Sequence, residues 1–238
     1  MPLPSFTVRC LGKKLVAPGV YEFRVEKPQG FTFTAGQFAF FVVPAAGNPA
    51  DVQNRAYSIA SAPHDPELLF VIKIVKGGRA GAWFENVVSE GTTMTMQGPC
   101  GVFTLDRKTA KPYLFIATGT GIAPFRSQAR SLLLEQGEKR EIHLLFGVLK
   151  KVDMFWEEEW KKMEEEHPNF HAHISYLDGG IDWHGESGAV PDRACTIINA
   201  SPCSIYLCGS EQIVKELKQV CLEKLQVPKE DVHAESFV

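Results

Sequence analysis

The spacing of hydrophobic and polar positions changes about half-way along the chain. Up to residue 108, short β-rich segments alternate with turn signals built from Gly, Pro and Asn. The segments are 6–11, 21–26, 37–43, 56–60, 68–75 and 92–97. Short strands at this spacing predict an antiparallel β-barrel, with one helix over residues 80–88.

From residue 109, apolar strand candidates alternate with amphipathic helices. The predicted strands are 113–117, 142–146, 171–176 and 204–208, and the predicted helices are 124–135, 154–166 and 211–225. This alternation predicts an α/β domain with a doubly wound parallel sheet. We therefore expect two domains, 1–108 and 109–238, with the border in the polar stretch 106–111.

Composition narrows the class of protein. The net charge is −3 and no block of basic residues occurs, which argues against a nucleic-acid partner. The six Cys form no CxxC pair or regular framework, as is usual for reduced thiols. No apolar run has the length of a signal peptide or membrane span. We expect a soluble, cytoplasmic protein.

A glycine-rich loop stands between a predicted strand and a predicted helix, in the sequence LFIATGTGIAPFR over residues 114–126. Gly119 and Gly121 allow backbone N–H groups to approach a diphosphate, and a helix N-terminus adds partial positive charge. We expect Pro124 at the first helical position, where its missing N–H costs nothing. The alternative is a tight turn before an ordinary helix.

A second candidate lies on the predicted strand 56–60 and the residues just before it. Alternation puts Arg55, Tyr57 and Ile59 on one face, and Ser58 on the other. A guanidinium binds a diphosphate bidentately, an aromatic ring covers a planar heterocycle, and a hydroxyl bonds a ring nitrogen. The alternative is a surface ladder of polar residues.

Together these motifs resemble the ferredoxin–NADP+ reductase superfamily, in its order and spacing, over essentially the whole chain. The matching residues are Gly36-Gln37-Phe38, Arg55-x-Tyr57-Ser58, Gly98-Pro99-Cys100-Gly101-Val102-Phe103, Gly119–Pro124, Cys208-Gly209 and Glu235-Ser236-Phe237. The resemblance implies a barrel that binds flavin, FAD rather than FMN, and a parallel-sheet domain that binds NADH or NADPH.

For the flavin, the resemblance implies that Arg55 holds the pyrophosphate, Tyr57 packs on the isoalloxazine and Ser58 hydrogen-bonds N5. Val71 and Lys73 are expected to contact the cofactor.

The chain departs from the family pattern at Arg79-Ala80-Gly81, where glycine replaces the serine whose hydroxyl binds phosphate. Backbone N–H groups at this helix start can still bind the anion, with help from Arg79. We expect Gly81→Ser to leave flavin affinity equal or higher.

For the nicotinamide nucleotide, the resemblance implies that Thr118 lies near the nicotinamide and Thr120 touches the flavin. The remaining expected contacts on this side are Gly119, Gly121, Pro124, Gly147, Cys208 and Gly209.

Cys208 is expected to orient the nicotinamide and not to act as a nucleophile, although a Cys in an apolar strand is ordinarily a packing residue. Glu235 would stabilise charge as hydride leaves, and Phe237 would lie near the flavin edge. Ser58, Cys208 and Glu235 are thus the predicted catalytic residues.

The sequence contains features that favour NADPH and features that favour NADH. Lys150 and Lys151 can meet a 2′-phosphate, whereas Asp153 can meet a ribose hydroxyl, and a solvated loop is the plain alternative. Residues 182–190 resemble the W-x-G-x-x-G-x-V of relatives that use NADH, so we expect a preference for NADH.

The chain is predicted to be a flavin-dependent NAD(P)H reductase that passes electrons to a separate carrier such as ferredoxin or flavodoxin. Alternatives are a reductase that uses free flavin as substrate, and a non-catalytic flavin subunit of a larger complex. His167, His171 and His173 lack a carboxylate or Cys that would complete a metal site. No close cysteine cluster predicts an iron–sulfur centre.

Overall fold

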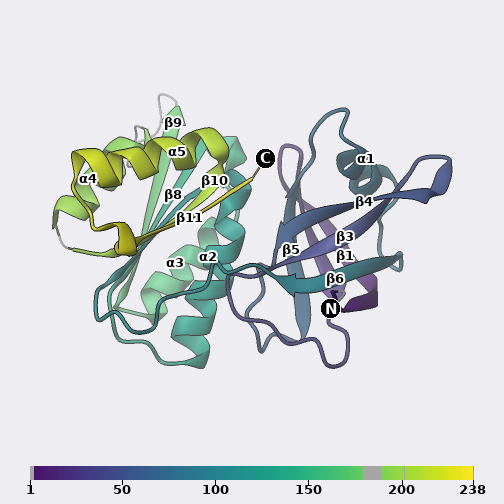
Figure 1. Ribbon diagram of the computed structural model, residues 1–238, viewed down its shortest axis with the longest axis horizontal. Coiled ribbons are helices and arrows are strands. Elements are labelled where there is room, and N and C mark those ends of the chain that lie inside the picture. The colour runs from purple at the N-terminus through teal and green to yellow at the C-terminus, as the bar shows by residue number, and fades with distance from the viewer. Residues whose placement is uncertain (1–2, 179–188, 201, 238) are drawn as a thin grey trace. The chain divides into compact units, whose positions relative to one another are not determined.

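The computed structural model describes residues 3–178, 189–200 and 202–237, and the chain forms two compact units (Figure 1). The first contains residues up to Leu105 together with Arg126–Ser131. The second contains Asp106–Phe125 and the residues from Leu132 onward. The polar stretch 106–111 opens the second unit.

The first unit is built on six antiparallel strands in the order β4-β3-β6-β1-β2-β5. The strands are β1 Ser5–Ala17, β2 Val20–Glu26, β3 Phe38–Ala45, β4 Asn48–Ser58, β5 Glu67–Lys73 and β6 Thr93–Cys100. Just beyond β4, the Ala60 N–H donates to the Leu69 carbonyl of β5 over 2.8 Å. This bond links the two outer strands of the order, as the predicted barrel requires.

Aromatic side chains fill the interior of this barrel. Phe23 and Phe41 point inward from β2 and β3, and each packs against Phe84, with ring centroids 5.0 and 5.5 Å apart. Phe84 belongs to helix α1 (Arg79–Asn86), which follows β5. Because Phe84 is fully buried, the helix is anchored in the same core as the strands.

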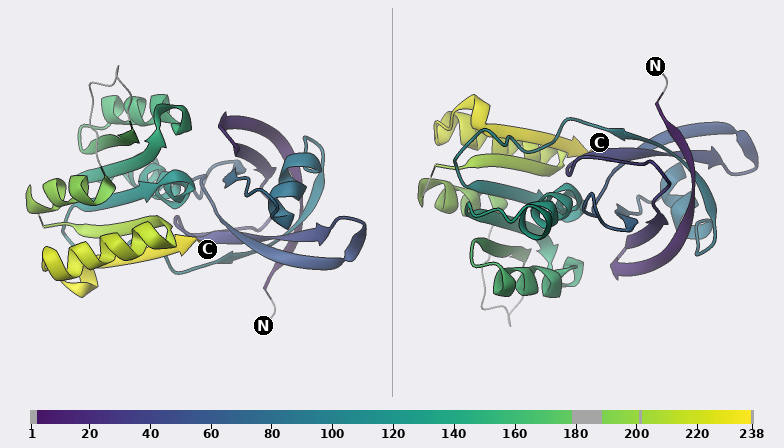
Figure 2. Two further views of the ribbon diagram at one scale, coloured as in Figure 1. Left: turned by 90° about the horizontal axis from the view of Figure 1, so that it is seen from above. Right: turned by 90° about the horizontal axis from the view of Figure 1, so that it is seen from below.

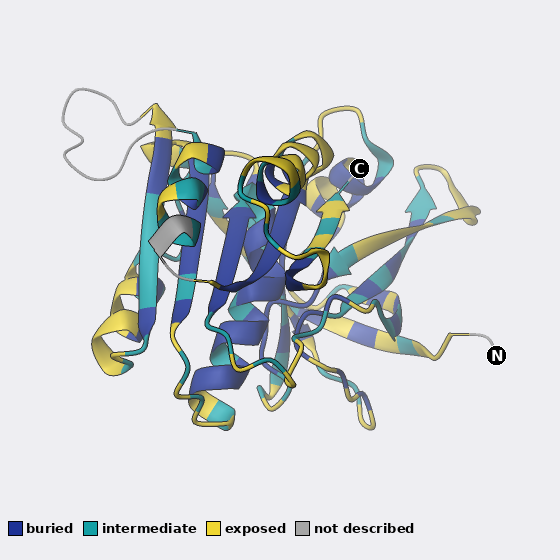
Figure 3. Ribbon diagram, turned by 60° about the vertical axis from the view of Figure 1, so that its left-hand side comes forward, coloured by how far each residue is buried: buried dark blue, intermediate teal, exposed yellow. Residues whose placement is uncertain are grey.

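The second unit contains a five-stranded parallel sheet in the order β11-β10-β7-β8-β9. Its strands are β7 Tyr113–Thr118, β8 Ile142–Lys150, β9 Phe170–Asp178, β10 Ser204–Ser210 and β11 Val232–Phe237. The central β7 and β10 are buried on both faces (Figure 3), so their sequences are almost wholly apolar and do not alternate.

Helices pack on both faces of the parallel sheet (Figure 2). Helices α2 (Ile122–Arg130) and α3 (Glu157–Glu166) supply Phe125 and Trp160, which stack on Phe115 and Phe170. Helices α4 (Val190–Ala200) and α5 (Glu211–Gln219) contribute to a separate apolar cluster with β7, β8 and β10. The predicted two-part fold, an antiparallel barrel followed by a doubly wound parallel sheet, is confirmed.

Several predicted strands and helices needed correction. The strand predicted over 56–60 is the end of the longer β4, which stops at Ser58, so Ile59 and Ala60 do not continue the alternation. Helix α4 and strand β11 were not predicted as elements at all. The helices predicted to run to residues 135 and 225 finish in wider π-helical turns, over Ser131–Glu135 and Val220–Lys224.

Helix starts also differ from the sequence-based expectation. A 3-10 turn over Gly119–Gly121 precedes α2, which places Pro124 at the third helical position and not the first. It remains in the first turn, where its backbone nitrogen needs no helical partner. Helix α3 begins at Glu157, after Trp156 in a left-handed conformation. None of the described helices is long and apolar enough to cross a membrane.

Candidate active site

Strand β4 presents the first group of predicted site residues. Tyr57 pairs with Ala39 of β3 and is half-buried, its ring edge-on to Phe84 at 5.3 Å. Burial raises the pKa of Tyr57 to about 12, so the phenol is neutral at physiological pH. Ser58, at the end of the strand, is buried. Arg55 is exposed and donates to the Asn54 carbonyl over 3.0 Å.

Strand β5 adds the second predicted pair. Val71 and Lys73 alternate with Ile72 and so lie on one face of the strand. Val71 is buried and Lys73 is exposed. The pair therefore places an apolar side chain beside a cation on this face.

The N-terminus of α1 is the third element. Its first turn contains no acidic residue, and its N-cap is Gly78, which has no side chain that could cap the helix. Arg79 is held by both carboxylate oxygens of Asp51 on β4, each at 2.9 Å. Hydrogen bonding to Arg79 lowers the pKa of Asp51. Arg79 therefore ties the helix start to β4, a contact that the sequence did not reveal.

Close packing explains why residue 81 is a glycine, and the local sequence does not reveal this packing. A Cβ at this position would lie 2.7 Å from the Val75 carbonyl oxygen and 3.2 Å from the Val75 nitrogen. Both are backbone atoms and cannot rotate away. A side chain here would push α1 away from Val75, which favours weaker flavin binding in Gly81→Ser and so opposes the sequence-based expectation of equal or higher affinity.

In the second unit, the carboxyl ends of the parallel strands bring three predicted glycines into close contact with neighbouring segments. A Cβ on Gly121 would lie 2.3 Å from the Cys208 carbonyl oxygen, and a Cβ on Gly209 would lie 2.2 Å from Thr118 Oγ1. A Cβ on Gly147 would meet Val190 of α4 at 2.0 Å. The glycines thus let β7, β8 and β10 and their following segments pack closely at this edge.

Gly119 is different from these three. Its φ is +52°, and a Cβ there would meet no atom within 4 Å. The loop thus leaves open space beside Gly119, next to a helix start without acidic residues. Backbone exposed in this way suits a diphosphate, so the residues present fit a dinucleotide. Thr118 and Thr120, which flank Gly119, are both half-buried.

Cys208 and Glu235 lie directly opposite each other in the register of β10 and β11. The thiol is buried, and burial together with the Glu235 carboxylate raises its pKa well above the usual value. A neutral thiol fits the predicted orienting role and does not fit a nucleophile. Phe237, half-buried, pairs with Ser210 two residues further along the same strands. Ser210 lies at the N-cap of α5 and makes no side-chain cap bond.

The segment after β8 carries the candidates for nucleotide selectivity. Lys150 and Lys151 are exposed. Asp153 Oδ2 accepts the Lys150 backbone N–H over 3.0 Å, so this carboxylate stabilises its own turn. The motif expected over 182–190 falls mainly outside the described residues, which resume at Ala189.

Two of the three histidines considered for a metal site, His171 and His173, have neighbours that the sequence did not suggest. His171 and His173 lie beside His143 of β8, whose Nδ1 is 3.4 Å from His173 Nε2. His171 Nε2 lies 2.6 Å from a Glu141 carboxylate oxygen, so a carboxylate does adjoin the group. Burial and the neighbouring histidines lower the pKa of His143. Within the described residues, no group of three or more side chains is arranged to hold a metal.

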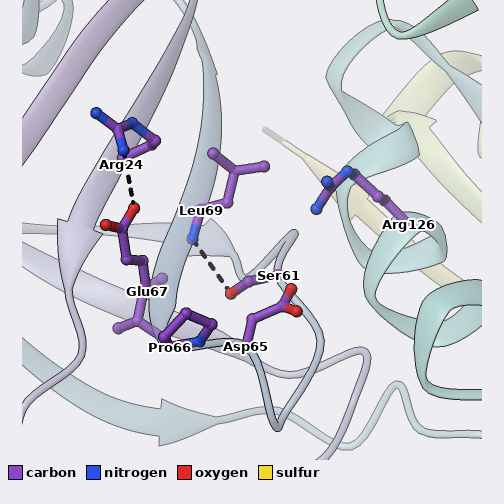
Figure 4. Close-up of a pocket in the computed structure, with 8 residues that line it drawn as sticks. Arg24, Ser61, Asp65, Pro66, Glu67, Leu69 and Arg126 are labelled. Atoms are coloured by element: carbon purple, nitrogen blue, oxygen red, sulfur yellow. Dashed lines mark hydrogen bonds and ion pairs between the residues drawn. The ribbon is translucent and has the colours of Figure 1, made fainter. Parts of the chain in front are cut away.

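A shallow cavity in the first unit contains none of the predicted site residues (Figure 4). It is lined by Arg24, Ser61, Asp65, Pro66, Glu67, Leu68, Leu69 and Arg126. Arg24 pairs with Glu67 at 3.2 Å, and Arg126 donates to the Ala60 carbonyl at 2.8 Å. These side chains bind protein groups, and the cavity offers no catalytic constellation.

Comparison with known proteins agrees with this division. Residues 13–105 match an oxidoreductase FAD-binding domain, and residues 115–219 match an oxidoreductase NAD-binding domain. Ferredoxin–NADP reductase B of Sorangium cellulosum is 32% identical, over 98% of this chain and 97% of its own length.

Larger relatives match over part of their length. The ferredoxin–NAD(P)+ reductase component of the Pseudomonas putida naphthalene 1,2-dioxygenase system is 32% identical over 90% of this chain, which spans only 62% of that relative. In the crystal structure of the Amycolatopsis cytochrome P450 reductase GcoB, the match has a TM-score of 0.89 at 26% identity, over 99% of this chain and 70% of that one.

Fold, site and matched domains define a flavoprotein oxidoreductase with an FAD-binding barrel and an NAD(P)-binding parallel sheet. The chain belongs to the ferredoxin–NADP reductase family. It is an oxidoreductase whose two domains match those that bind FAD and a nicotinamide nucleotide.

Proposed function

We propose that Cys208 and Glu235 form the centre that accepts the reactive ring of NAD(P)H, and that the Tyr57–Ser58 end of β4 accepts the flavin. The observation that carries this proposal is the pairing of a buried, neutral thiol with Glu235 at the strand edge beside the Gly119 loop. Ligands of open parallel sheets bind at the carboxyl ends of the strands.

On the flavin side, Tyr57 supplies a half-buried ring whose orientation is maintained by Phe84, and Ser58 supplies a hydroxyl at the strand end. Arg55 and the first turn of α1, with Arg79, Ala80 and Gly81, bind the pyrophosphate in this proposal. Val71 packs against the ring and Lys73 lies beside it.

On the nicotinamide side, the backbone at Gly119 binds the diphosphate and Thr118 contacts the nicotinamide, while Thr120 lies toward the flavin. Close packing at Gly121, Gly147 and Gly209 keeps this edge compact enough for the ring to approach Cys208. Pro124 lies in the first turn of α2, which follows the loop. Bound FAD supplies the hydride acceptor, and transfer requires the two rings in close contact with water excluded.

The electron acceptor is proposed to be a separate redox protein. The relatives named above include a ferredoxin reductase and a dioxygenase reductase component. Ferredoxin, flavodoxin or an oxygenase component are the acceptors of matching chemistry. We place this exchange in the cytoplasm, where the thiols of a chain with six Cys and no CxxC pair would stay reduced.

An absorbance spectrum of the purified protein, before and after anaerobic NADH, tests the proposal. Bound flavin that bleaches with NADH, followed by reoxidation with ferricyanide and then with a [2Fe–2S] ferredoxin, is the expected result. Protein that binds no flavin, or binds flavin that NADH and NADPH leave oxidised, contradicts it. Flavin lost on gel filtration but turned over when added in excess indicates the free-flavin reductase.

The preference for NADH stays a prediction, tested by comparing kcat/KM for NADH and NADPH. The exposed Lys150 and Lys151 provide the matched variant. If these lysines bind a 2′-phosphate, changing both to Ala lowers kcat/KM for NADPH and leaves NADH unchanged. A strong preference of the unmodified protein for NADPH would reverse the prediction.

A further inference from the structure

Lys13 is the residue that links strand β1 to helix α1. Its Nζ donates to the Phe84, Glu85 and Val88 carbonyl oxygens, at 2.8, 2.6 and 3.2 Å. These carbonyls belong to the last turn of the helix and the residues just after it. Helix C-termini carry partial negative charge and unpaired carbonyls, and a cation there is stabilising.

The helix has no substitute for this contact in its own sequence. Its last turn contains no basic residue. The Lys13 ammonium also lies 4.9 Å from the centre of the Tyr21 ring, on strand β2. Lys13 is half-buried, so its bonds are shielded in part from water. The cation that the C-terminus of α1 needs therefore comes from β1, about seventy residues earlier in the chain.

The position of α1 affects the proposed flavin site at two points. Phe84 contacts the edge of Tyr57, so movement of the helix changes the support of this ring. The N-terminus of the same helix begins at Arg79, which is bound to Asp51, and is the proposed pyrophosphate site. Lys13 and the Arg79–Asp51 pair thus hold opposite ends of one short helix.

We propose that Lys13 is a positioning residue for flavin binding: it fixes the C-terminus of α1 and, through Phe84 and the helix axis, the ring support and the pyrophosphate site. This inference rests on the proposed function, because it takes Tyr57 and the start of α1 as flavin contacts. Lys13 itself touches none of the proposed contact atoms of the cofactor.

The test is a titration of the flavin-free protein with FAD, FMN and riboflavin. Lys13→Met keeps most of the side-chain length without the charge, Lys13→Arg restores a cation, and Lys14→Met at the exposed neighbouring position is the matched control. We expect Lys13→Met to raise the Kd for FAD about tenfold, in keeping with lost charged hydrogen bonds. Lys13→Arg should recover most of the affinity, and Lys14→Met should match the unmodified protein.

Two further readouts separate positioning from general destabilisation. Hydrogen exchange should increase in α1 and remain unchanged in β1 and β6, and the visible spectrum of bound flavin should shift in Lys13→Met and return in Lys13→Arg. If Lys13→Met does not fold, Lys13→Gln, which keeps an uncharged N–H donor group, is titrated in its place.

An FAD Kd in Lys13→Met or Lys13→Gln within twofold of the unmodified protein overturns the inference, as does an equal loss in Lys14→Met. Failure of the unmodified protein to bind FAD would instead contradict the proposed function.

Discussion

Gly121→Ala is expected to slow hydride transfer by about 100-fold while leaving flavin bound. The added Cβ would lie 2.3 Å from the Cys208 carbonyl oxygen and 2.6 Å from the Cys208 carbonyl carbon. Ordinary van der Waals contact begins at 3.4 Å, so one of the two segments must move by about 1 Å. A displacement of this size at a reacting centre costs about 100-fold in rate.

The assay is stopped-flow bleaching of the flavin by NADH without oxygen. Gly137→Ala is the matched control, because Gly137 has a φ of +60° and a Cβ there meets no atom within 4 Å. The control costs about 1–2 kcal/mol of stability through left-handed strain, and Gly121→Ala about 1–3 kcal/mol through overpacking. Similar stability losses with very different hydride-transfer rates would isolate the displacement of Cys208.

A bleaching rate in Gly121→Ala within threefold of the unmodified protein would refute this reasoning. Such a rate would mean either that the sheet edge accommodates the added methyl group without displacing Cys208, or that Cys208 does not contact the nicotinamide.

Three other predictions follow from the same structure. Cys208→Ala should slow hydride transfer tenfold or more with flavin still bound, and unchanged transient kinetics would remove Cys208 from the mechanism. Gly81→Ser should weaken FAD binding, because its Cβ would lie 2.7 Å from the Val75 carbonyl oxygen, and titration showing equal or tighter binding would contradict this. Hydrogen bonding to Arg140 lowers the pKa of Glu138 from 4.5 to about 2, which at about 1.4 kcal/mol per pKa unit corresponds to at most about 3.5 kcal/mol. This stability is present above pH 4.5 and is lost as pH falls toward 2. Urea denaturation should therefore show a large destabilisation by Glu138→Gln at pH 6 that shrinks toward pH 2, and a destabilisation that does not change with pH would contradict this.

The barrel and the parallel sheet were predictable because their signals are local. Alternation and turn glycines mark the first, and apolar runs followed by amphipathic segments mark the second. Strand β11 was missed because its six residues, Val232–Phe237, alternate weakly, and their place is determined by pairing with β10. Pro124 was misplaced because a 3-10 turn precedes the α-helix, so the helix begins two residues before the proline. The general preference of proline for the first helical position does not reveal such a turn.

The candidate residues were found by motif, but their physical reasons depend on distant contacts. Gly147 needs to be small because Val190 packs on it from a helix about forty residues later. Gly81 was interpreted as a lost hydroxyl, whereas its backbone neighbour at Val75 excludes a side chain. The contact between Lys13 and α1 has no local signature, since a lysine on a strand is ordinarily a solvated residue.

The packing at Gly81 bears on the choice between the two enzyme functions considered for this chain. Taken alone, the absence of a serine hydroxyl at this position would favour a reductase that uses free flavin as substrate. Because packing against Val75 accounts for the glycine, the substitution no longer indicates weak binding. In the proposed site, anion binding then falls to the backbone N–H groups of α1, a helix that contacts Asp51 at one end and Lys13 at the other. A helix fixed in this way presents its N–H groups in one arrangement, and preorganised donors bind an anion without a further loss of conformational entropy. The same rigidity that excludes a side chain at Gly81 therefore favours flavin that stays bound, and with it transfer of electrons to a separate acceptor.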